Sequence, residues 1–257
     1  MTGVGRRAVL GLAVAAGVGA LAGCAKDGSP TASPSTSDTP SDLPLSAPAE
    51  PDATAPAAGA LRVVDSGWSH ESREGVKVFS YGVIVENTSD RVAFQTTASV
   101  RFTDASGLDV MAPEGSFLDG RVTVVLPGER VGFGATFLSV AKGAEKMDVE
   151  LVTAEWWAKD NTALEFAPIT VGDVATDRAH PPKQLMFTVT SGYTEQLVST
   201  RAAAVFRDEA GKIVGGTTAP EPSALPSGES KGGFGVEYGM PLSAAPAATE
   251  VYVPILI

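Results

Sequence analysis

The sequence predicts an all-β protein with two tandem immunoglobulin-like antiparallel β-sandwiches, which follow a signal peptide and a disordered linker. Three observations lead to this prediction. Short apolar runs of period two fill the chain after Leu61, and no apolar period of 3.6 residues is sustained there. The same order of runs and turns also occurs twice.

The first 23 residues have the layout of a signal peptide. Arg6 and Arg7 form a positive segment, residues 8–20 carry no charge, and small residues precede Cys24. The apolar run is shorter than the roughly 20 residues that a membrane-spanning helix needs. Either of two export routes fits these residues, the general secretory route or the twin-arginine route for proteins that are exported already folded.

The only cysteine closes the tetrapeptide Leu21-Ala22-Gly23-Cys24, which resembles the lipobox of bacterial lipoproteins. The resemblance implies that cleavage leaves Cys24 as the new N-terminus and that its thiol is lipidated. It also implies at least two acyl chains, which would hold the protein on the outer, extracytoplasmic face of the cell membrane. Two chains anchor stably, because each buried methylene contributes about 0.8 kcal/mol and one chain alone binds only marginally.

Residues 24–60 have a different composition from the rest of the chain. They are built mainly from Pro, Ser, Thr, Ala and Asp, with no aromatic residue. Such a segment cannot bury enough apolar surface to offset the entropy of ordering it. We therefore expect a disordered tether with a reach of roughly 30 Å. Its composition leaves O-glycosylation open.

The charge of the chain excludes some partners. The net charge is -11, and removal of residues 1–23 takes away two arginines and no acid, which brings it to -13. An acidic surface repels phosphate backbones and anionic headgroups. We therefore expect no nucleic-acid partner, and we expect membrane attachment to come from the acyl chains on Cys24.

The strands follow in order as alternating apolar and polar residues. The runs cover residues 79–85, 98–102, 131–137 and 147–151. This alternation predicts one face in a core and one face in water, so Ser80, Gly82 and Ile84 are expected on a wet face.

The pattern then recurs in the second half of the chain. Residues 81–85 match 185–189, 100–107 match 204–211, 126–129 match 225–229, 133–137 match 234–238, and 147–151 match 251–255. We therefore predict a first sandwich over residues 61–158 and a second over 159–257, each with about seven strands and its own core. Pro254 interrupts the last strand and predicts that this strand lies at a sheet edge.

Two kinds of turn connect the strands. Asp104-Ala105-Ser106-Gly107 and its repeat at 208–211 fit hairpin loops, in which Asp caps the turn and Gly takes a positive φ. Leu126-Pro127-Gly128-Glu129 and its repeat at 225–229 lead into the next strand, with proline setting the bend.

Three tracts of the first repeat, residues 82–90, 100–107 and 126–129, resemble the FxLYD family of small envelope β-sandwich modules. The family carries a Gly-x-Val-x-Asn-x-Ser strand end, a strand that closes in an aromatic residue, Asp and Gly, and a Pro-Gly-Glu turn. The second repeat departs from it, because Ser191-Gly192-Tyr193-Thr194 replaces Asn87-Thr88-Ser89-Asp90. The first repeat also has Thr103 where the family usually has tyrosine. The resemblance implies an immunoglobulin-like sandwich in a surface protein, and it implies no reaction.

The sequence offers little for catalysis or metal binding. His70 and His180 are its only histidines, and no Gly-x-Ser-x-Gly motif occurs. His70-Glu71 begins like a zinc motif, but Glu74 stands where the second histidine should be. We expect no catalytic residue, no resident metal and no cofactor. Calcium between the sandwiches stays open as an alternative, with acids such as Glu155, Asp160 and Asp173 near the junction.

Trp156 and Trp157 lie where the first repeat ends. Neighbouring strand residues point to opposite faces, so only one of the two can enter the first core. The other plugs the hinge between the domains or forms a candidate binding surface, since exposed aromatic residues mark interaction sites.

These observations together indicate a membrane-anchored extracytoplasmic lipoprotein that acts as a non-catalytic binding or scaffolding module of the cell envelope, with an envelope protein as candidate partner. The alternative is a small-ligand or metal-ion receptor with its site at the domain junction.

Lipidation gives the first testable prediction. Substitution Cys24→Ser removes the thiol that would carry the acyl chains, so the variant should remain unprocessed or be released from the membrane. Fractionation of cells and the mass of the protein check this outcome. A variant that is processed and membrane-bound like the wild type would contradict the prediction.

Overall fold

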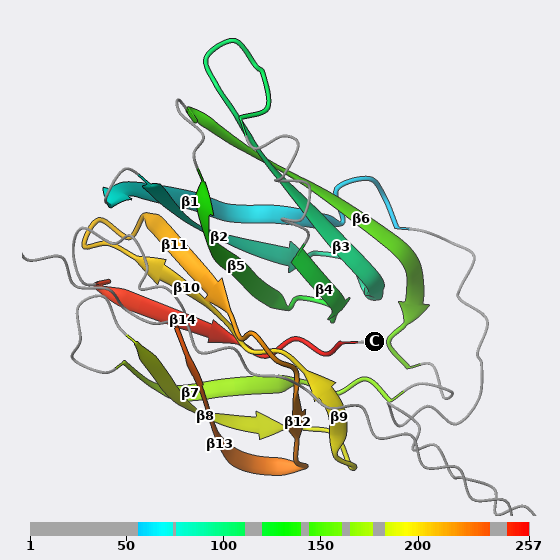
Figure 1. Ribbon diagram of the computed structural model, residues 1–257. Coiled ribbons are helices and arrows are strands. Elements are labelled where there is room, and N and C mark those ends of the chain that lie inside the picture. The colour runs from blue at the N-terminus through cyan, green and yellow to red at the C-terminus, as the bar shows by residue number, and fades with distance from the viewer. Residues whose placement is uncertain are drawn as a thin grey trace, which may run out of the picture. The chain divides into compact units, whose positions relative to one another are not determined.

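The computed structural model describes residues 56–73, 76–110, 120–139, 144–160, 165–176, 183–236 and 246–256. The described residues are all β, and they form several antiparallel sheets that pack on one another (Figure 1). The prediction of an all-β fold is therefore confirmed. The predicted signal peptide, Cys24 and His180 lie outside the described residues.

The strands divide between the two repeats. The first repeat holds β1 (Leu61–Arg73), β2 (Val76–Asn87), β3 (Arg91–Thr103), β4 (Gly120–Val125), β5 (Arg130–Ser139) and β6 (Lys146–Ala158). The second holds β7 (Ile169–Thr176), β8 (Gln184–Ser191), β9 (Leu197–Thr200), β10 (Ala203–Arg207), β11 (Ile213–Thr218), β12 (Ser223–Leu225), β13 (Gly228–Gly235) and β14 (Ala248–Tyr252). Among the described residues the first repeat forms six strands and the second forms eight, where about seven were expected in each.

The two repeats share one order of strands. The sheet β1-β2-β5 corresponds to β7-β8-β13, with the central strand hydrogen-bonded on both sides in each. The sheet β4-β3-β6 corresponds to two smaller sheets, β12-β9 and β11-β10-β14. Strand β14 pairs only with β10, so the strand before Pro254 lies at a sheet edge as predicted. The described residues all belong to one compact unit, and the division at residue 158 remains a prediction.

The first core lies between the β1-β2-β5 and β4-β3-β6 sheets. Strand β3 alternates as predicted, with Ala98, Val100 and Phe102 buried and the residues between them exposed. Facing them are Tyr81, Val83 and Val85 from β2. The aromatic rings of Phe102 and Tyr81 meet edge-on at 6.0 Å, a favourable arrangement of ring quadrupoles.

The prediction that one face of β2 is exposed to water is wrong. Ser80, Gly82 and Ile84 are all buried, because the β11-β10-β14 sheet of the second repeat covers this face. Figure 1 shows that sheet between β1-β2-β5 and β7-β8-β13. The β2 strand is therefore covered on both sides, and the alternation in its sequence reflects two different kinds of packing rather than core against water.

Glycines allow the two sheets to approach closely. A Cβ on Gly82 would lie 2.6 Å from the Gly215 carbonyl oxygen, and one on Gly134 would lie 2.7 Å from the Gly216 Cα. A Cβ on Gly132 would lie 2.3 Å from the ring of Tyr252. Sheets usually pack about 10 Å apart because side chains fill the gap between them. At these glycines the backbone itself forms the contact.

Hydroxyl groups satisfy the polar backbone in this contact. Ser80 Oγ donates to the Gly216 carbonyl oxygen at 3.1 Å and accepts from the Gly216 N–H at 3.0 Å. Thr218 Oγ1 donates to the Gly134 carbonyl oxygen at 2.6 Å. Buried backbone groups without partners are costly, so these bonds make the close approach tolerable. The contact therefore depends on small residues and hydroxyls rather than on a broad apolar core.

The start of β3 packs into the second core rather than the first. Gln95 has a φ of 51° and is skipped in the pairing of β3 with both β4 and β6. On its N-terminal side, Val92 and Phe94 join the core cluster that contains Leu185 and Phe206 of the second repeat. The strand therefore changes the face that it turns to each core at Gln95, while its register with β4 and β6 stays the same on either side.

The glycine contact gives the second testable prediction. Substitution Gly82→Ala places a methyl group against the Gly215 carbonyl, which cannot move without separating the sheets. We expect the free energy of unfolding to fall by about 1–3 kcal/mol, the usual cost of overpacking. Urea unfolding measures it. Gly235→Ala is the matched control, because its nearest neighbour would be 3.9 Å away. Equal stability of the two variants would contradict the prediction.

Candidate functional site: a cavity where the repeats meet

The two tryptophans singled out in the sequence turn to different cores. Trp156 is partly buried and packs against the first core, whereas Trp157 is only 3% exposed and belongs to the second. Trp157 meets Phe94 edge-on, and its Nε1 donates to Glu155 Oε2 at 3.0 Å. Trp157 therefore presents little surface to an external partner in this arrangement.

The structure does not gather the other candidate residues into a site. His70 is exposed and stacks on Trp68 and Phe79 at the start of the first repeat. Glu155 accepts the bond from Trp157, and Asp173 accepts one from Thr188 Oγ1. Across the described part of the chain, no three residues among His, Cys, Asp and Glu lie together in a way that could hold a metal ion. Nor do the described residues include a helix long and apolar enough to cross a membrane.

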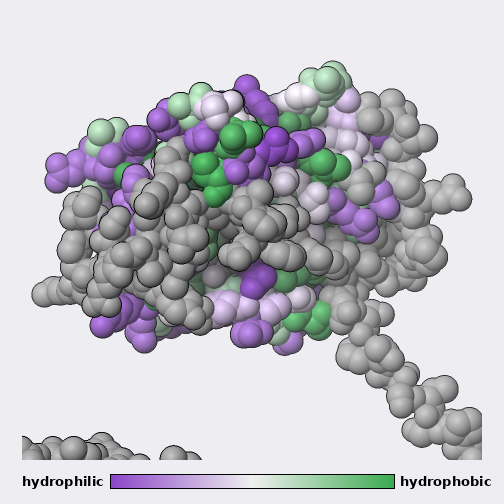
Figure 2. Space-filling model, turned by 45° about the horizontal axis from the view of Figure 1, so that its top comes forward, coloured by the Kyte–Doolittle hydropathy of each residue, from purple (hydrophilic) through white to green (hydrophobic). Residues whose placement is uncertain are grey.

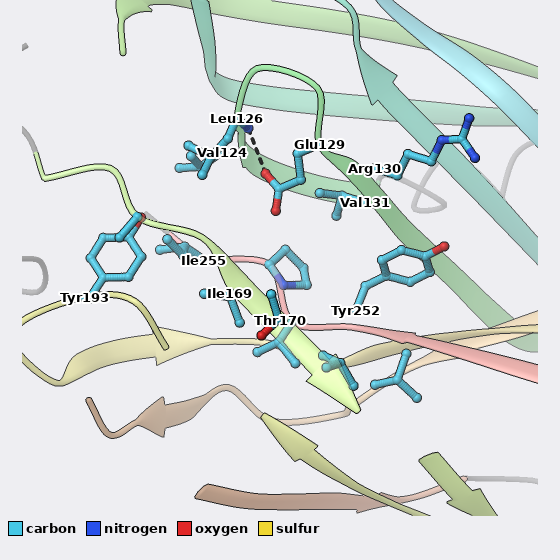
Figure 3. Close-up of a pocket in the computed structure, with 15 residues that line it drawn as sticks. Val124, Leu126, Glu129, Arg130, Val131, Ile169, Thr170, Tyr193, Tyr252 and Ile255 are labelled. Atoms are coloured by element: carbon cyan, nitrogen blue, oxygen red, sulfur yellow. Dashed lines mark hydrogen bonds between the residues drawn. The ribbon is translucent and has the colours of Figure 1, made fainter. Parts of the chain in front are cut away.

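A cavity of about 310 Å³ lies where the two repeats meet (Figure 3). Its first wall is the end of β4, the turn after it and the start of β5. The opposite wall is formed by β7, by Tyr193 after β8, and by the last residues after β14. Small-molecule sites are clefts of about 300–1,000 Å³ with mostly apolar walls and a few polar groups, so this cavity falls at the lower end of that range.

The turn at residues 126–129 directs Glu129 into the cavity. Gly128 has a φ of 75°, and the Glu129 N–H donates to the Leu126 carbonyl oxygen at 3.0 Å, so the tetrapeptide closes as the predicted turn. The Glu129 side chain folds back, and its Oε2 accepts from the Leu126 N–H at 2.7 Å. Among the described residues, Oε1 has no hydrogen-bond partner. Figure 3 shows the carboxyl group between the turn and the C-terminal segment.

Asn87 holds this turn in place. It is fully buried, and its Nδ2 donates to the carbonyl oxygens of Arg91 at 2.6 Å and Val125 at 2.8 Å. The backbone carbonyl oxygen of Asn87 accepts from the Gly128 N–H at 2.8 Å. The asparagine in the strand-end motif thus joins β2, β3 and the turn before β5. Its role is to position the cavity wall rather than to contact a ligand.

Burial raises the pKa of Glu129 to about 7, and the bond from the Leu126 N–H opposes this shift. A carboxyl group in water has a pKa near 4.5, so burial is the dominant influence here. The group is half protonated near neutral pH. It can then accept a hydrogen bond as a carboxylate or donate one as an acid.

Tyr193 forms part of the wall opposite Glu129. It is 4% exposed, and burial raises the pKa of its hydroxyl to about 12, helped by the charges of Glu129 and Glu165 and opposed by a hydrogen bond with the Ala167 backbone. Its N–H donates to Ser191 Oγ at 3.3 Å. The tyrosine belongs to the tetrapeptide in which the second repeat departs from the first, so this wall exists because the repeats differ.

The arginine and the second tyrosine that line the cavity are held by partners. Arg130 Nε donates to Glu86 Oε1 at 3.0 Å, and Glu86 also accepts from Arg62 Nη2 at 2.8 Å. These two arginines lower the pKa of Glu86. The Tyr252 hydroxyl donates to Glu250 Oε2 at 2.6 Å. Glu129 is therefore the lining carboxyl group with an oxygen left for a ligand.

Sequence reasoning treated Glu129 only as a turn residue and did not single out Tyr193 as a site residue. The signal that could have found both is the difference between the repeats. In the second repeat the same turn contains an extra Ser227, and its Glu229 is exposed. Glu129 and Glu229 occupy equivalent turns but differ in burial, which marks a position where the two repeats differ in structure.

The described surface offers less evidence for a binding site than the cavity does. On the face shown in Figure 2, apolar side chains of the described residues occur in small patches among hydrophilic ones. Large exposed apolar patches mark protein interfaces, whereas scattered apolar residues are ordinary. The described part of this face therefore does not favour a broad apolar docking surface.

Comparison with protein-family models finds no match for the chain, and comparison with curated proteins finds none either. Among solved structures, the chain is similar to a single-residue mutant of oxalate decarboxylase from Bacillus subtilis. The match covers 79% of this chain and 75% of that chain, at 9% sequence identity and a TM-score of 0.12. A TM-score this low carries no argument about fold or function.

The pKa of Glu129 gives the third testable prediction. Above about pH 4.5 the carboxyl group ionises in the unfolded chain, but in the folded protein it keeps its proton until about pH 7. The contribution of this group to the free energy of unfolding is therefore complete below pH 4.5 and is lost as the pH rises through 7. The loss in the free energy of unfolding is at most about 3 kcal/mol. Glu129→Gln cannot ionise, so its stability should fall less than that of the wild type over this interval.

Urea unfolding of both proteins at about pH 5 and about pH 8 measures this difference. The control is Glu229→Gln, which changes the equivalent exposed carboxyl group of the second repeat and should follow the wild type. Parallel changes in the wild type and Glu129→Gln would show that Glu129 titrates normally.

Proposed function

We propose that this protein is a membrane-anchored extracytoplasmic lipoprotein of the cell envelope, and that its folded part is a non-catalytic binding module that captures a small molecule at the junction of the repeats. The lipobox resemblance at Cys24 supports the anchor, and the composition of residues 24–60 supports a tether between anchor and fold. We also propose that the folded part consists of two immunoglobulin-like sandwiches.

The observation that carries the proposal is the junction cavity. Its lining combines aliphatic side chains with polar groups, and one carboxyl oxygen is left without a partner among the described residues. A ligand would be enclosed by segments from both repeats. Such a site favours the small-ligand receptor over the scaffolding module, for which the buried Trp157 offers little contact surface.

Binding rather than catalysis is the better-supported activity. Nucleophilic catalysis needs a nucleophile beside a base, and general acid–base catalysis usually needs a second group to complete the proton transfer. The cavity is lined by Glu129, by tyrosines and an arginine that have other partners, and by Thr170. We therefore assign Glu129 to ligand recognition, with no reaction attached.

The fourth prediction tests this function with a variant at the cavity mouth. Thr170 is exposed and lines the cavity, so Thr170→Phe should obstruct entry while leaving the core intact. Full-length lipidated protein is purified from its own membrane, and the small molecules released on denaturation are identified by mass spectrometry. A molecule recovered with the wild type should be strongly depleted from Thr170→Phe.

The matched control is Thr176→Phe, which adds the same ring to an exposed position of β7 away from the cavity lining. It should retain the molecule like the wild type. Equal recovery from all three proteins would place the ligand elsewhere. Recovery of one stoichiometric envelope protein from all three, with no small molecule, would instead favour the scaffolding function.

A further inference from the structure

We infer that the ligand of the junction cavity is a small organic cation, an ammonium group attached to a compact apolar body, and that Glu129 Oε1 accepts its hydrogen bond. The inference rests on the proposed function and names the class of ligand. Its basis is the position of one carboxyl group in the cavity and the lack of a compensating charge beside it.

The first step is the geometry of the carboxyl group. Glu129 is partly buried, and only its Oε2 is occupied, by the Leu126 N–H at 2.7 Å. The turn closed by Gly128, and Asn87 behind it, hold the group against the cavity. A buried carboxylate is expensive unless an opposite charge and further hydrogen bonds accompany it. No buried side-chain oxygen of the described residues lacks a partner, so the free Oε1 meets solvent on the cavity side, where a cationic ligand can reach it.

The second step is that the protein does not supply that charge itself. Arg130 follows Glu129 in sequence, but its guanidinium is bound to Glu86 and points away from the Glu129 carboxyl group in Figure 3. The influences on the pKa of Glu129 are burial and the Leu126 N–H, with no arginine among them. A cationic ligand would thus complete an ion pair that the described residues leave incomplete.

The third step concerns the other titratable groups that face the cavity. Tyr193 stays neutral at physiological pH because burial raises its pKa to about 12. Tyr252 donates its hydroxyl hydrogen to Glu250, and Glu165 adds negative charge that Tyr193 senses. Glu129 is the carboxyl group among the lining residues, so an anionic ligand would be repelled by it, whereas a cation would be attracted. A lone metal ion fits less well, because hard cations need several oxygen ligands.

The fourth step sets the size and the apolar part of the ligand. The cavity volume is about 310 Å³, and aliphatic side chains such as Val131, Ile169 and Val253 line it. An ammonium group alone would leave these walls in contact with water. A short alkyl or single-ring body fills the space and buries apolar surface, which adds affinity in proportion to the area removed from water.

The fifth prediction compares three probes of nearly equal shape: benzylammonium, benzyl alcohol and benzoate. Full-length lipidated protein in nanodiscs is titrated with each probe by ligand-observed NMR, with empty nanodiscs as the blank. Benzylammonium should bind in the millimolar range expected for a probe of this size, at least tenfold more tightly than the other two at about pH 8. Its advantage should shrink at about pH 5.5, because Glu129 gains a proton and loses its charge.

Two variants separate recognition from folding. Glu129→Gln keeps the shape of the side chain but removes the charge, so the three probes should bind equally. Glu229→Gln changes the equivalent exposed residue and should keep the full preference of the wild type. Unfolding by urea confirms that both variants are folded.

The outcomes distinguish this inference from the proposed function. No preference for benzylammonium, no binding of it, or a preference that survives in Glu129→Gln overturns the cation inference. If benzyl alcohol or benzoate binds instead and Thr170→Phe abolishes that binding, the small-ligand function stands and the ligand class is wrong.

Discussion

The close contact between the β1-β2-β5 sheet and the β11-β10-β14 sheet is the constraint on which the rest of the structure depends. Gly82 and Gly134 leave no room for a side chain, so backbone meets backbone across the repeats. Ser80 bridges to Gly216 in both directions and compensates the buried polar groups. Polar contacts depend on position far more than apolar ones do, because a displaced hydrogen bond leaves a buried group unsatisfied. This contact therefore sets the register of one repeat on the other.

The cavity follows from that register. Once the sheets are in contact, the turn at residues 126–129 lies opposite the start of β7 and the segment after β14. At this junction Tyr193 and its neighbours stand where the first repeat has the strand-end motif of Asn87. The two similar frameworks thus differ at their junction, where a partly open cavity is lined by a carboxyl group.

Hydrogen bonds and burial hold the residues that we propose to bind the ligand. Glu129 is fixed by its own turn, the turn by Asn87, and the second wall by the buried Tyr193. Preorganised groups lose little entropy when a ligand binds, which favours affinity in a small cavity. The tether proposed for residues 24–60 would place this rigid site away from the membrane surface without restricting its approach to a solute.

The sequence by itself determined the strand class, the turns and the repeated order of strands. Period-two runs and Asp/Gly or Pro/Gly turns are local properties, and β3 shows the predicted alternation of buried and exposed residues. It could not determine which partner covers the second face of β2. Ser80, Gly82 and Ile84 look like a wet face, and only the apposition of the second repeat buries them.

The same limit applies to the candidate site. Glu129 and Glu229 stand in nearly the same local sequence, yet only the tertiary structure places Glu129 in a cavity and Glu229 at the surface. The reason is physical: secondary structure follows from interactions within a few residues, whereas desolvation of a side chain depends on which distant segments pack around it.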